Sequence, residues 1–225
     1  MRLHLPDVPT VAITTPWQGR RRSHLSQSLR GLGFGNVQWI VGQRSDPYWL
    51  GHAAEMRRAL ASHACPLLVL EDDATLLPGN YRAEVQCPDD ADVLFLGGTL
   101  GAERYDGQGA ELMRVAEPGF PWPLVYAEVD ADHLRVFNML GTHAVLFLSD
   151  PAREAFRASV PDPATRPADV WFAREMPRWN ALLVKRPFWY QRDGKHERIS
   201  RSYYPGAAPA GRGGREAFRR LRLRG

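Results

Sequence analysis

Apolar segments of strand length alternate with segments of helical period through the first hundred residues of this chain. Residues 10–15 form a run rich in β-branched side chains, and residues 37–42 form a second apolar run. Between them, over residues 21–32, leucines recur every three or four positions, which predicts a helix. Such alternation is typical of an α/β fold whose central sheet is mostly parallel and flanked by helices.

The same reading extends to the rest of the chain. Residues 100–137 are rich in Gly and Pro, so we expect a loop region or a small antiparallel excursion there. Ser149 or Asp150 is suited to cap a helix that has Pro151 at its first position. The patterns predict further helices at 48–63, 151–159 and 169–176, and strands at 67–70, 92–98, 141–148 and 181–190.

Length and composition favour one globular domain. The chain has 225 residues, of which 44% are hydrophobic and 24% charged, close to the average for globular proteins. The longest apolar runs have strand length and are too short to span a bilayer. The N-terminal residues lack the uninterrupted apolar segment of a secretory signal, so we expect a cytoplasmic protein. Cys65 and Cys87 are expected to be buried thiols.

The net charge of +4 is concentrated at the C-terminal end. Residues 211–225 carry six arginines and one glutamate, so the remainder is near neutral. Residues 206–214 are rich in Gly, Ala and Pro, which is typical of a flexible linker. We therefore divide the chain into a domain over residues 1–205 and a flexible basic tail over residues 206–225, which is suited to contact an anionic surface and could hold the protein at the periphery of a membrane.

Three consecutive carboxylates follow the apolar run at residues 67–70. Glu71, Asp72 and Asp73 are expected to emerge at the carboxyl end of that strand, which is where open α/β sheets bind ligands. Adjacent carboxylates repel one another unless a cation or a set of donors offsets the charge. In an extended segment Glu71 and Asp73 would face one side and Asp72 the other. The triplet is therefore a candidate site for Mn²⁺ or Mg²⁺, and the alternative is a solvated acidic turn.

The segment at residues 67–74, with its acidic triplet, resembles the strand and EDD signature of glycosyltransferase family 25, the lipopolysaccharide-type galactosyltransferases of GT-A fold. Shorter motifs follow the same order as in that family over residues 10–202, although the first strand ends in Thr14-Thr15-Pro16-Trp17 where the family has an Asn-Leu-like step. The shorter motifs are an Arg-rich segment after the first strand, Ser62-His63, Gly141-Thr142-His143-Ala144, Pro167-Ala168-Asp169, Pro187, Gln191 and Ser200.

The resemblance implies a metal-dependent transferase with a GT-A-like fold, a nucleotide-sugar donor and inversion at the sugar carbon. Asp73 would ligate the metal together with Glu71, and Asp72 or Glu71 would meet the ribose or a metal-bound water. His196 is the candidate third metal ligand, with His143 as the second choice, although a histidine on a polar loop is often only solvated. The expected donor is a uridine diphosphate sugar.

Two further sets of residues complete the predicted site. Asp169 is the candidate general base that takes the proton of the acceptor hydroxyl, and the alternative is that it caps the helix at residues 169–176. Thr14, Thr15, Arg20 and Arg21 follow the first strand and are predicted to contact the diphosphate; a solvated helix start is the alternative. Four tryptophans are candidate sugar platforms or core residues: Trp122, Trp171, Trp179 and Trp189.

The predicted function is therefore glycosyl transfer from a nucleotide-sugar to a hydroxyl acceptor, either a glycan or a lipopolysaccharide-type molecule. The basic tail motivates a first alternative, a phage-type transferase that glycosylates a hydroxymethylated base in DNA. A second alternative is a non-catalytic module that binds a nucleotide-sugar or a glycan.

Overall fold

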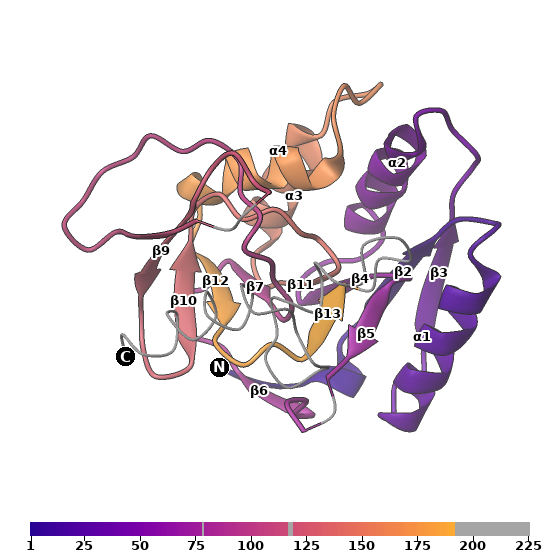
Figure 1. The fold of residues 1–225 in the computed structure, drawn as a ribbon. Coiled ribbons are helices and arrows are strands. Elements are labelled where there is room, and N and C mark those ends of the chain that lie inside the picture. Colours follow the sequence, from indigo (N-terminus) through magenta and orange to yellow (C-terminus); the bar gives the residue numbers. More distant parts are fainter. Residues whose placement is uncertain (78, 117–118, 192–225) are drawn as a thin grey trace.

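A nine-stranded mixed sheet forms the centre of the computed structural model, which describes residues 1–77, 79–116 and 119–191 (Figure 1). Two small antiparallel sheets lie beside it, formed by β1 (Arg2–His4) with β6 (Glu84–Gln86) and by β5 (Ala74–Leu76) with β13 (Trp189–Gln191). The order of the large sheet is β3 (Val37–Val41), β2 (Thr10–Thr14), β4 (Leu67–Glu71), β11 (Ala144–Phe147), β7 (Val93–Phe95), β12 (Ala181–Val184), β10 (His133–Val136), β9 (Leu124–Glu128) and β8 (Met113–Val115).

The strand directions correct one prediction. Strands β2, β3 and β4 are parallel to one another, and β12 is parallel to β7. The other five neighbouring pairs of the large sheet are antiparallel, because β11 runs against both β4 and β7, and β8, β9 and β10 form an antiparallel meander beside β12. The protein is therefore α/β as predicted, but the prediction of a mostly parallel sheet is wrong.

Helices cover both faces of the sheet. The helices of the described residues are α1 (Gly19–Gly31), α2 (Tyr48–Leu60), α3 (Asp150–Ser159) and α4 (Ala168–Glu175), with 3-10 turns η1 (Leu5–Asp7) and η2 (Met176–Arg178). Helices α2, α3 and α4 contact one another on one face (Figure 1). Helix α1 packs through Leu25 and Leu29 on the other face, into a second core cluster. Successive side chains of β4 alternate between the two clusters, so both faces of this strand are buried.

Most element predictions are confirmed within one to three residues, with informative exceptions. Ser149 caps α3, since its hydroxyl accepts a hydrogen bond from the Ala152 amide at 3.4 Å. The single strand predicted at residues 181–190 is wrong, because this segment forms β12 in the large sheet and then β13 in a small one. Trp189 at its end is fully buried, whereas Trp122 is exposed. Cys87 is buried as expected, and Cys65 is half-buried.

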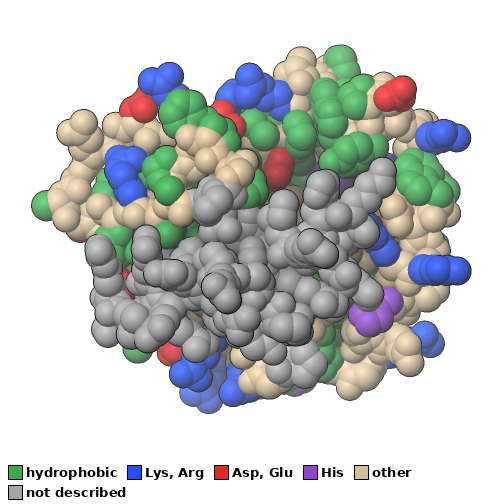
Figure 2. All heavy atoms as spheres, viewed as in Figure 1, with side chains coloured by type: hydrophobic (Ala, Val, Ile, Leu, Met, Phe, Trp, Pro, Cys, Tyr) green, Lys and Arg blue, Asp and Glu red, His purple; other side chains and the backbone are tan. Residues whose placement is uncertain are grey.

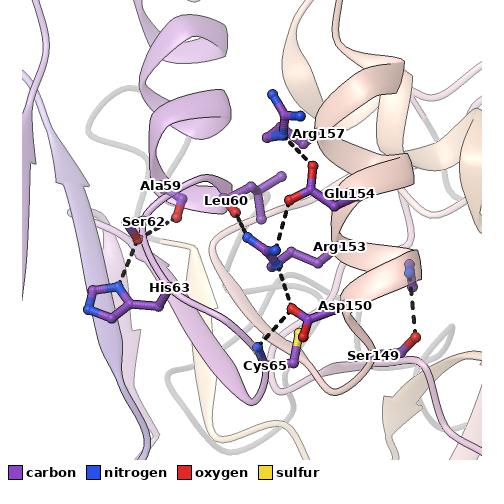
Figure 3. A network of polar contacts seen from close by, with 11 residues as sticks. Ala59, Leu60, Ser62, His63, Cys65, Ser149, Asp150, Arg153, Glu154 and Arg157 are labelled. Atoms are coloured by element: carbon purple, nitrogen blue, oxygen red, sulfur yellow. Dashed lines mark hydrogen bonds and ion pairs between the residues drawn. The ribbon is translucent and has the colours of Figure 1, made fainter.

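A polar network ties the end of α2 to the start of α3 (Figure 3). The Arg153 guanidinium donates to the Leu60 carbonyl oxygen and pairs with the carboxylates of Asp150 and Glu154. Asp150 also accepts a hydrogen bond from the Cys65 amide at 3.0 Å. Because Arg153 is buried, these contacts offset its charge, and they also hold the C-terminal end of α2 against α3. Among the described residues, no helix is long and apolar enough to cross a membrane.

Candidate functional site

A cavity of about 440 Å³ opens at the carboxyl ends of β2 and β4. These two strands are parallel, so their carboxyl ends lie at the same edge of the sheet. Strand β11 runs antiparallel to β4, so the residues just before β11 lie at this edge as well. The starts of α1, α2 and α4 surround this edge. The titratable residues of the lining are Arg21, His52, Glu55, Glu71, Asp72, Asp73 and Asp169.

Glu71 is the last residue of β4 and is held by two partners. Its Oε1 accepts a hydrogen bond from the Thr142 hydroxyl and lies 3.5 Å from His52 Nε2. Burial by itself disfavours the carboxylate, but His52 and Thr142 outweigh it and keep the pKa of Glu71 below its ordinary value. Glu71 is therefore an ionised carboxylate that is held by Thr142, just before β11, and by His52 of α2.

Asp72 and Asp73 lie in a turn rather than in the strand, because β4 ends at Glu71. Asp72 accepts a hydrogen bond from the Thr14 hydroxyl at 2.5 Å, and Asp73 accepts one from the Gln191 amide at 3.3 Å. Both carboxylates face the Arg21 guanidinium. The predicted alternation, with Asp72 turned away from the other two, is wrong because the period of two holds only in extended backbone.

Burial and the negative charge of Glu71 raise the pKa of Asp73 above its ordinary value, with the nearby Arg21 acting in the opposite direction. Asp73 is buried, and its Oδ1 atom has no hydrogen-bond partner among the described residues. Burial also raises the pKa of Asp72, although Thr14 and Arg21 favour its ionised form. The surroundings of the turn therefore disfavour full ionisation of both carboxyl groups unless further positive charge is supplied.

The two predicted arginines occupy different environments. Arg21, in the first turn of α1, lines the cavity, and its Nη1 lies 3.8 Å from Asp72 Oδ1 and 3.6 Å from Asp73 Oδ2. Arg20 is exposed and does not line the cavity, so we do not assign it to the diphosphate site. Thr14, the last residue of β2, and Thr15 both line the cavity, and their contact with a diphosphate stays a prediction.

Asp169 reaches the same cavity from the first turn of α4, 98 positions after Glu71. Pro167 is the N-cap residue of this helix, so the alternative in which Asp169 caps it is wrong. The Asp169 Oδ1 atom accepts a hydrogen bond from the Val170 amide at 2.8 Å. Burial, followed by repulsion from Glu71, raises the pKa of Asp169 to about 6.

His52 and Glu55, both on α2, are site residues that the sequence did not reveal. Burial alone would lower the pKa of His52, but the Glu71 carboxylate raises it to about 9. Burial raises the pKa of Glu55 to about 7, and neither of its carboxylate oxygens has a hydrogen-bond partner among the described residues. His52 and Glu55 are three positions apart, so they lie about one turn apart on the same face of α2, where the other residues are mostly buried.

The lining thus carries five carboxyl groups, on Glu55, Glu71, Asp72, Asp73 and Asp169, against the two basic side chains of Arg21 and His52. Carboxylate oxygens are the donors that Mg²⁺ and Mn²⁺ prefer, and the unpartnered Oδ1 of Asp73 is suited to such an ion. Residues 1–77, 79–116 and 119–191 nevertheless include no group of three or more His, Cys, Asp or Glu side chains arranged to hold a metal.

The two candidate histidine ligands are placed differently. His196 lies outside the described residues. His143, the second choice, is buried and does not line the cavity, and burial lowers its pKa to about 4. Within the described part of the chain, Glu71 and Asp73 therefore remain the predicted metal ligands, and Asp72 lies beside them. The Glu71 Oε1 atom is already paired with His52 and Thr142.

Aromatic side chains border the acidic part of the cavity. Trp17 is 49% exposed and Tyr48 is 73% exposed, and both line the cavity together with Trp49. Large exposed aromatic residues beside a polar cavity are typical of ligand-binding surfaces. None of the four predicted tryptophan platforms lines this cavity.

A larger hollow, of about 860 Å³, lies near the amino ends of β2 and β3. Its titratable lining residues are Asp7 and His63, so the Ser62-His63 motif lies away from the acidic cavity. The hollow has no cluster of charged groups comparable with that at the carboxyl ends of the strands. We therefore take the smaller, acidic cavity as the functional site.

Comparison with known protein families and with curated proteins gives no match for this chain. The resemblance to glycosyltransferase family 25 thus depends on the acidic triplet and on the order of the shorter motifs.

Proposed function

We propose that this protein is a metal-dependent glycosyltransferase of GT-A-like fold that transfers a sugar from a nucleotide-sugar to a hydroxyl group. The observation that carries the proposal is the convergence of Asp72, Asp73, Arg21 and Asp169 on one acid-lined cavity at the carboxyl ends of parallel strands. These four residues come from three separate parts of the chain, and each has a role in the predicted chemistry.

The charge of the cavity supports dependence on a metal. A diphosphate would be repelled by the carboxylates of Asp72 and Asp73 unless a cation lay between them. When bound, a divalent ion neutralises the charge that develops on the departing diphosphate. Asp73 and Asp72 would hold it, with Glu71 and His196 as the further predicted ligands. The hydrogen bonds from Thr14 and Gln191 already fix the two aspartates.

Asp169 is suited to act as the general base. Its pKa of about 6 lets it be ionised at neutral pH and still accept a proton. The acceptor oxygen forms a bond with the anomeric carbon while the bond from that carbon to the phosphate oxygen breaks. The electron pair of the broken bond stays on the diphosphate, and the acceptor proton passes to an Asp169 oxygen. Attack from the face opposite the diphosphate inverts the sugar carbon.

The aromatic border supports a nucleotide as the leaving group. Trp17 and Tyr48 offer flat apolar surfaces on the side of the cavity formed by the ends of β2 and the start of α2, and aromatic side chains stack favourably on bases. We propose a uridine diphosphate sugar as the donor and a glycan or lipopolysaccharide-type molecule as the acceptor.

A donor screen tests the proposal. Calorimetry and thermal shift would be measured with a panel of nucleotide-sugars, with and without Mn²⁺, on the parent protein and the variant Asp73→Ala. Asp90→Ala is the matched control, because Asp90 is exposed and lies outside the cavity. We expect one donor class to bind only with Mn²⁺, Asp73→Ala to lose this binding, and Asp90→Ala to retain it.

Product analysis separates transfer from binding alone. Release of the nucleoside diphosphate with a hydroxyl acceptor present supports the enzyme, whereas Mn²⁺-dependent binding without turnover supports the non-catalytic module. The enzyme proposal fails if no donor binds and Asp73→Ala behaves like the parent.

A further inference from the structure

We propose that the Arg21 guanidinium is an exchangeable counter-ion of Asp72 and Asp73: a divalent cation displaces it from these carboxylates, and the released side chain then binds the diphosphate. The inference rests on the proposed function, since it concerns the same cavity. It makes Arg21 a binding residue that couples metal binding to nucleotide binding.

The contacts of Arg21 are ion pairs without hydrogen bonds. Its Nη1 lies 3.8 Å from Asp72 Oδ1 and 3.6 Å from Asp73 Oδ2, whereas N–H···O hydrogen bonds have donor–acceptor distances of about 2.7–3.2 Å. The guanidinium is therefore attracted electrostatically to both carboxylates but forms a hydrogen bond with neither. No other hydrogen bond or ion pair holds this side chain among residues 1–77, 79–116 and 119–191.

The two carboxylates have other partners that do not depend on Arg21. Thr14 from β2 holds Asp72, and Gln191 from β13 holds Asp73. Departure of the guanidinium would leave both aspartates in place, and the Asp73 Oδ1 atom accepts no hydrogen bond from the described part of the chain. The oxygens that would receive a metal are thus preorganised by the strands, and Arg21 supplies only charge.

The position of Arg21 suits the second step of the exchange, in which the released guanidinium binds the diphosphate. It lies in the first turn of α1, where free backbone amides favour anions. Its side chain is partly exposed and lines the cavity together with Trp17 and Gln18. A divalent ion carries twice the charge of a guanidinium, so it competes favourably for the carboxylates. The displaced guanidinium is then a free bidentate donor for phosphate oxygens.

The exchange predicts opposite effects of one substitution on two affinities. Mn²⁺ binding would be measured by electron paramagnetic resonance for the parent, Arg21→Ala and Arg21→Lys, with Arg20→Ala as the matched control from the same turn. Arg21→Ala removes the competing charge, so we expect it to bind Mn²⁺ about three- to tenfold more tightly than the parent. Arg21→Lys keeps the charge and Arg20→Ala leaves the ion pairs intact, so both should match the parent.

The second affinity is that for a nucleoside diphosphate at saturating Mn²⁺. Arg21→Ala should bind it about tenfold more weakly, because the phosphate loses a charged donor. Arg20→Ala should again match the parent. A thermal melt of each variant shows that the folded state is retained.

Two results overturn the exchange while leaving the proposed function intact. One is Mn²⁺ binding that requires Asp73 but is unchanged or weakened in Arg21→Ala. The other is a diphosphate affinity that Arg21→Ala does not lower. If neither the parent nor Arg21→Ala binds Mn²⁺, both the exchange and the metal-dependent function are wrong.

Discussion

Glu71 and Asp73 are two residues apart, yet their surroundings lower the pKa of Glu71 and raise the pKa of Asp73. Glu71 is paired with His52 and Thr142, which favour its ionised form. Asp73 receives a weaker hydrogen bond from Gln191 and a distant ion pair from Arg21. A cation that entered the cavity would therefore gain most from Asp73. Burial, followed by the negative charge of Glu71, raises the pKa values of Asp73 and Asp169.

Substitution of Asp169 tests its role as the base. Asp169→Asn should lower kcat about 10²- to 10⁴-fold, since the amide cannot take the acceptor proton. In the parent, activity should fall as the pH drops through about 6, where Asp169 becomes protonated. A full rate in Asp169→Asn would exclude Asp169 as the base.

The same substitution should change stability in a pH-dependent way. The folded-state pKa of Asp169 is raised, so the folded protein holds this proton more tightly than the unfolded chain. Ionised Asp169 therefore costs stability, beginning near its ordinary pKa and reaching the full cost above pH 6. Asp169→Asn should gain about 1–3 kcal/mol at pH 7.5 and little at pH 4. Thermal melts at the two pH values check this, and an equal gain at both would contradict the burial argument.

Trp17 is predicted to contact the nucleobase. Trp17→Ala should weaken nucleotide binding about tenfold, because a base–aromatic stack contributes on the order of 1–3 kcal/mol. The control is Trp122→Ala, since Trp122 is also exposed but lies outside the cavity. Calorimetry with the nucleoside diphosphate would measure both variants, and equal affinities in the two would remove Trp17 from the site.

The residues of the site could be predicted in part from the sequence. The acidic triplet was found because the end of a strand is visible as a pattern, and Asp169 was found through the family resemblance at a predicted helix start. The fold brings them to one cavity. His52 and Glu55 were missed because α2 reads as an ordinary buried helix, and only tertiary packing reveals that its polar residues face the triplet. Trp189 offers no surface for a sugar because it is fully buried.

At the scale of elements, helix α2 packs closely against Gly42, which directly follows β3, through its residue Glu55. A Cβ atom on Gly42 would lie 0.9 Å from Glu55 Oε1, so a larger residue at position 42 would require the Glu55 side chain to move. Gly42 also donates its backbone amide to the Thr14 carbonyl oxygen at 2.8 Å. Gly42 thus contacts both Thr14 of β2 and Glu55 of α2, two residues that line the cavity.

The fit at Gly42 predicts a coupled pair. Gly42→Ala should lower the free energy of unfolding by about 1–3 kcal/mol through overpacking. In the background of Glu55→Ala the same change should cost much less, because the clashing carboxylate is gone. Denaturant unfolding of the two single variants and the double variant measures this coupling. Additive costs would show that α2 does not depend on this contact.

The existence of the elements was easier to predict than their directions. A buried apolar run such as that of β11 has the same pattern whether its neighbours are parallel or antiparallel. Its direction is set by the connection from β7, which passes through the antiparallel meander of β8, β9 and β10 before it returns. The residues after β12 leave the large sheet and pair with β5, a change that periodicity cannot show.

At the scale of the whole molecule, charge is distributed unevenly along the chain. Residues 8–45 contain five arginines and no acidic residue. They form β2, α1 and β3, and Figure 2 shows basic side chains along the right side of the molecule, where α1 and β3 lie. The acidic residues of the cavity thus lie beside a basic edge. The predicted tail at residues 206–225 lies outside the described residues.

Deletion of residues 206–225 separates the tail from the cavity. The shortened protein should bind anionic vesicles or duplex DNA more weakly and with a smaller salt dependence, because several arginines are lost. Its affinity for the nucleoside diphosphate with Mn²⁺ should be unchanged. Loss of vesicle binding favours an acceptor at a membrane, and loss of DNA binding favours the modified-base alternative. Unchanged binding to both would contradict a role of the tail in anionic contacts.

The most direct test is to locate the cation. Crystals of the protein would be soaked with Mn²⁺ and a uridine diphosphate compound, and the anomalous signal of manganese would be mapped. The account predicts a peak within coordination distance of an Asp73 carboxylate oxygen and of the diphosphate, with Arg21 turned from the aspartates toward the phosphate. A bound diphosphate with no manganese beside Asp73, and with Arg21 still paired to Asp72 and Asp73, would contradict it.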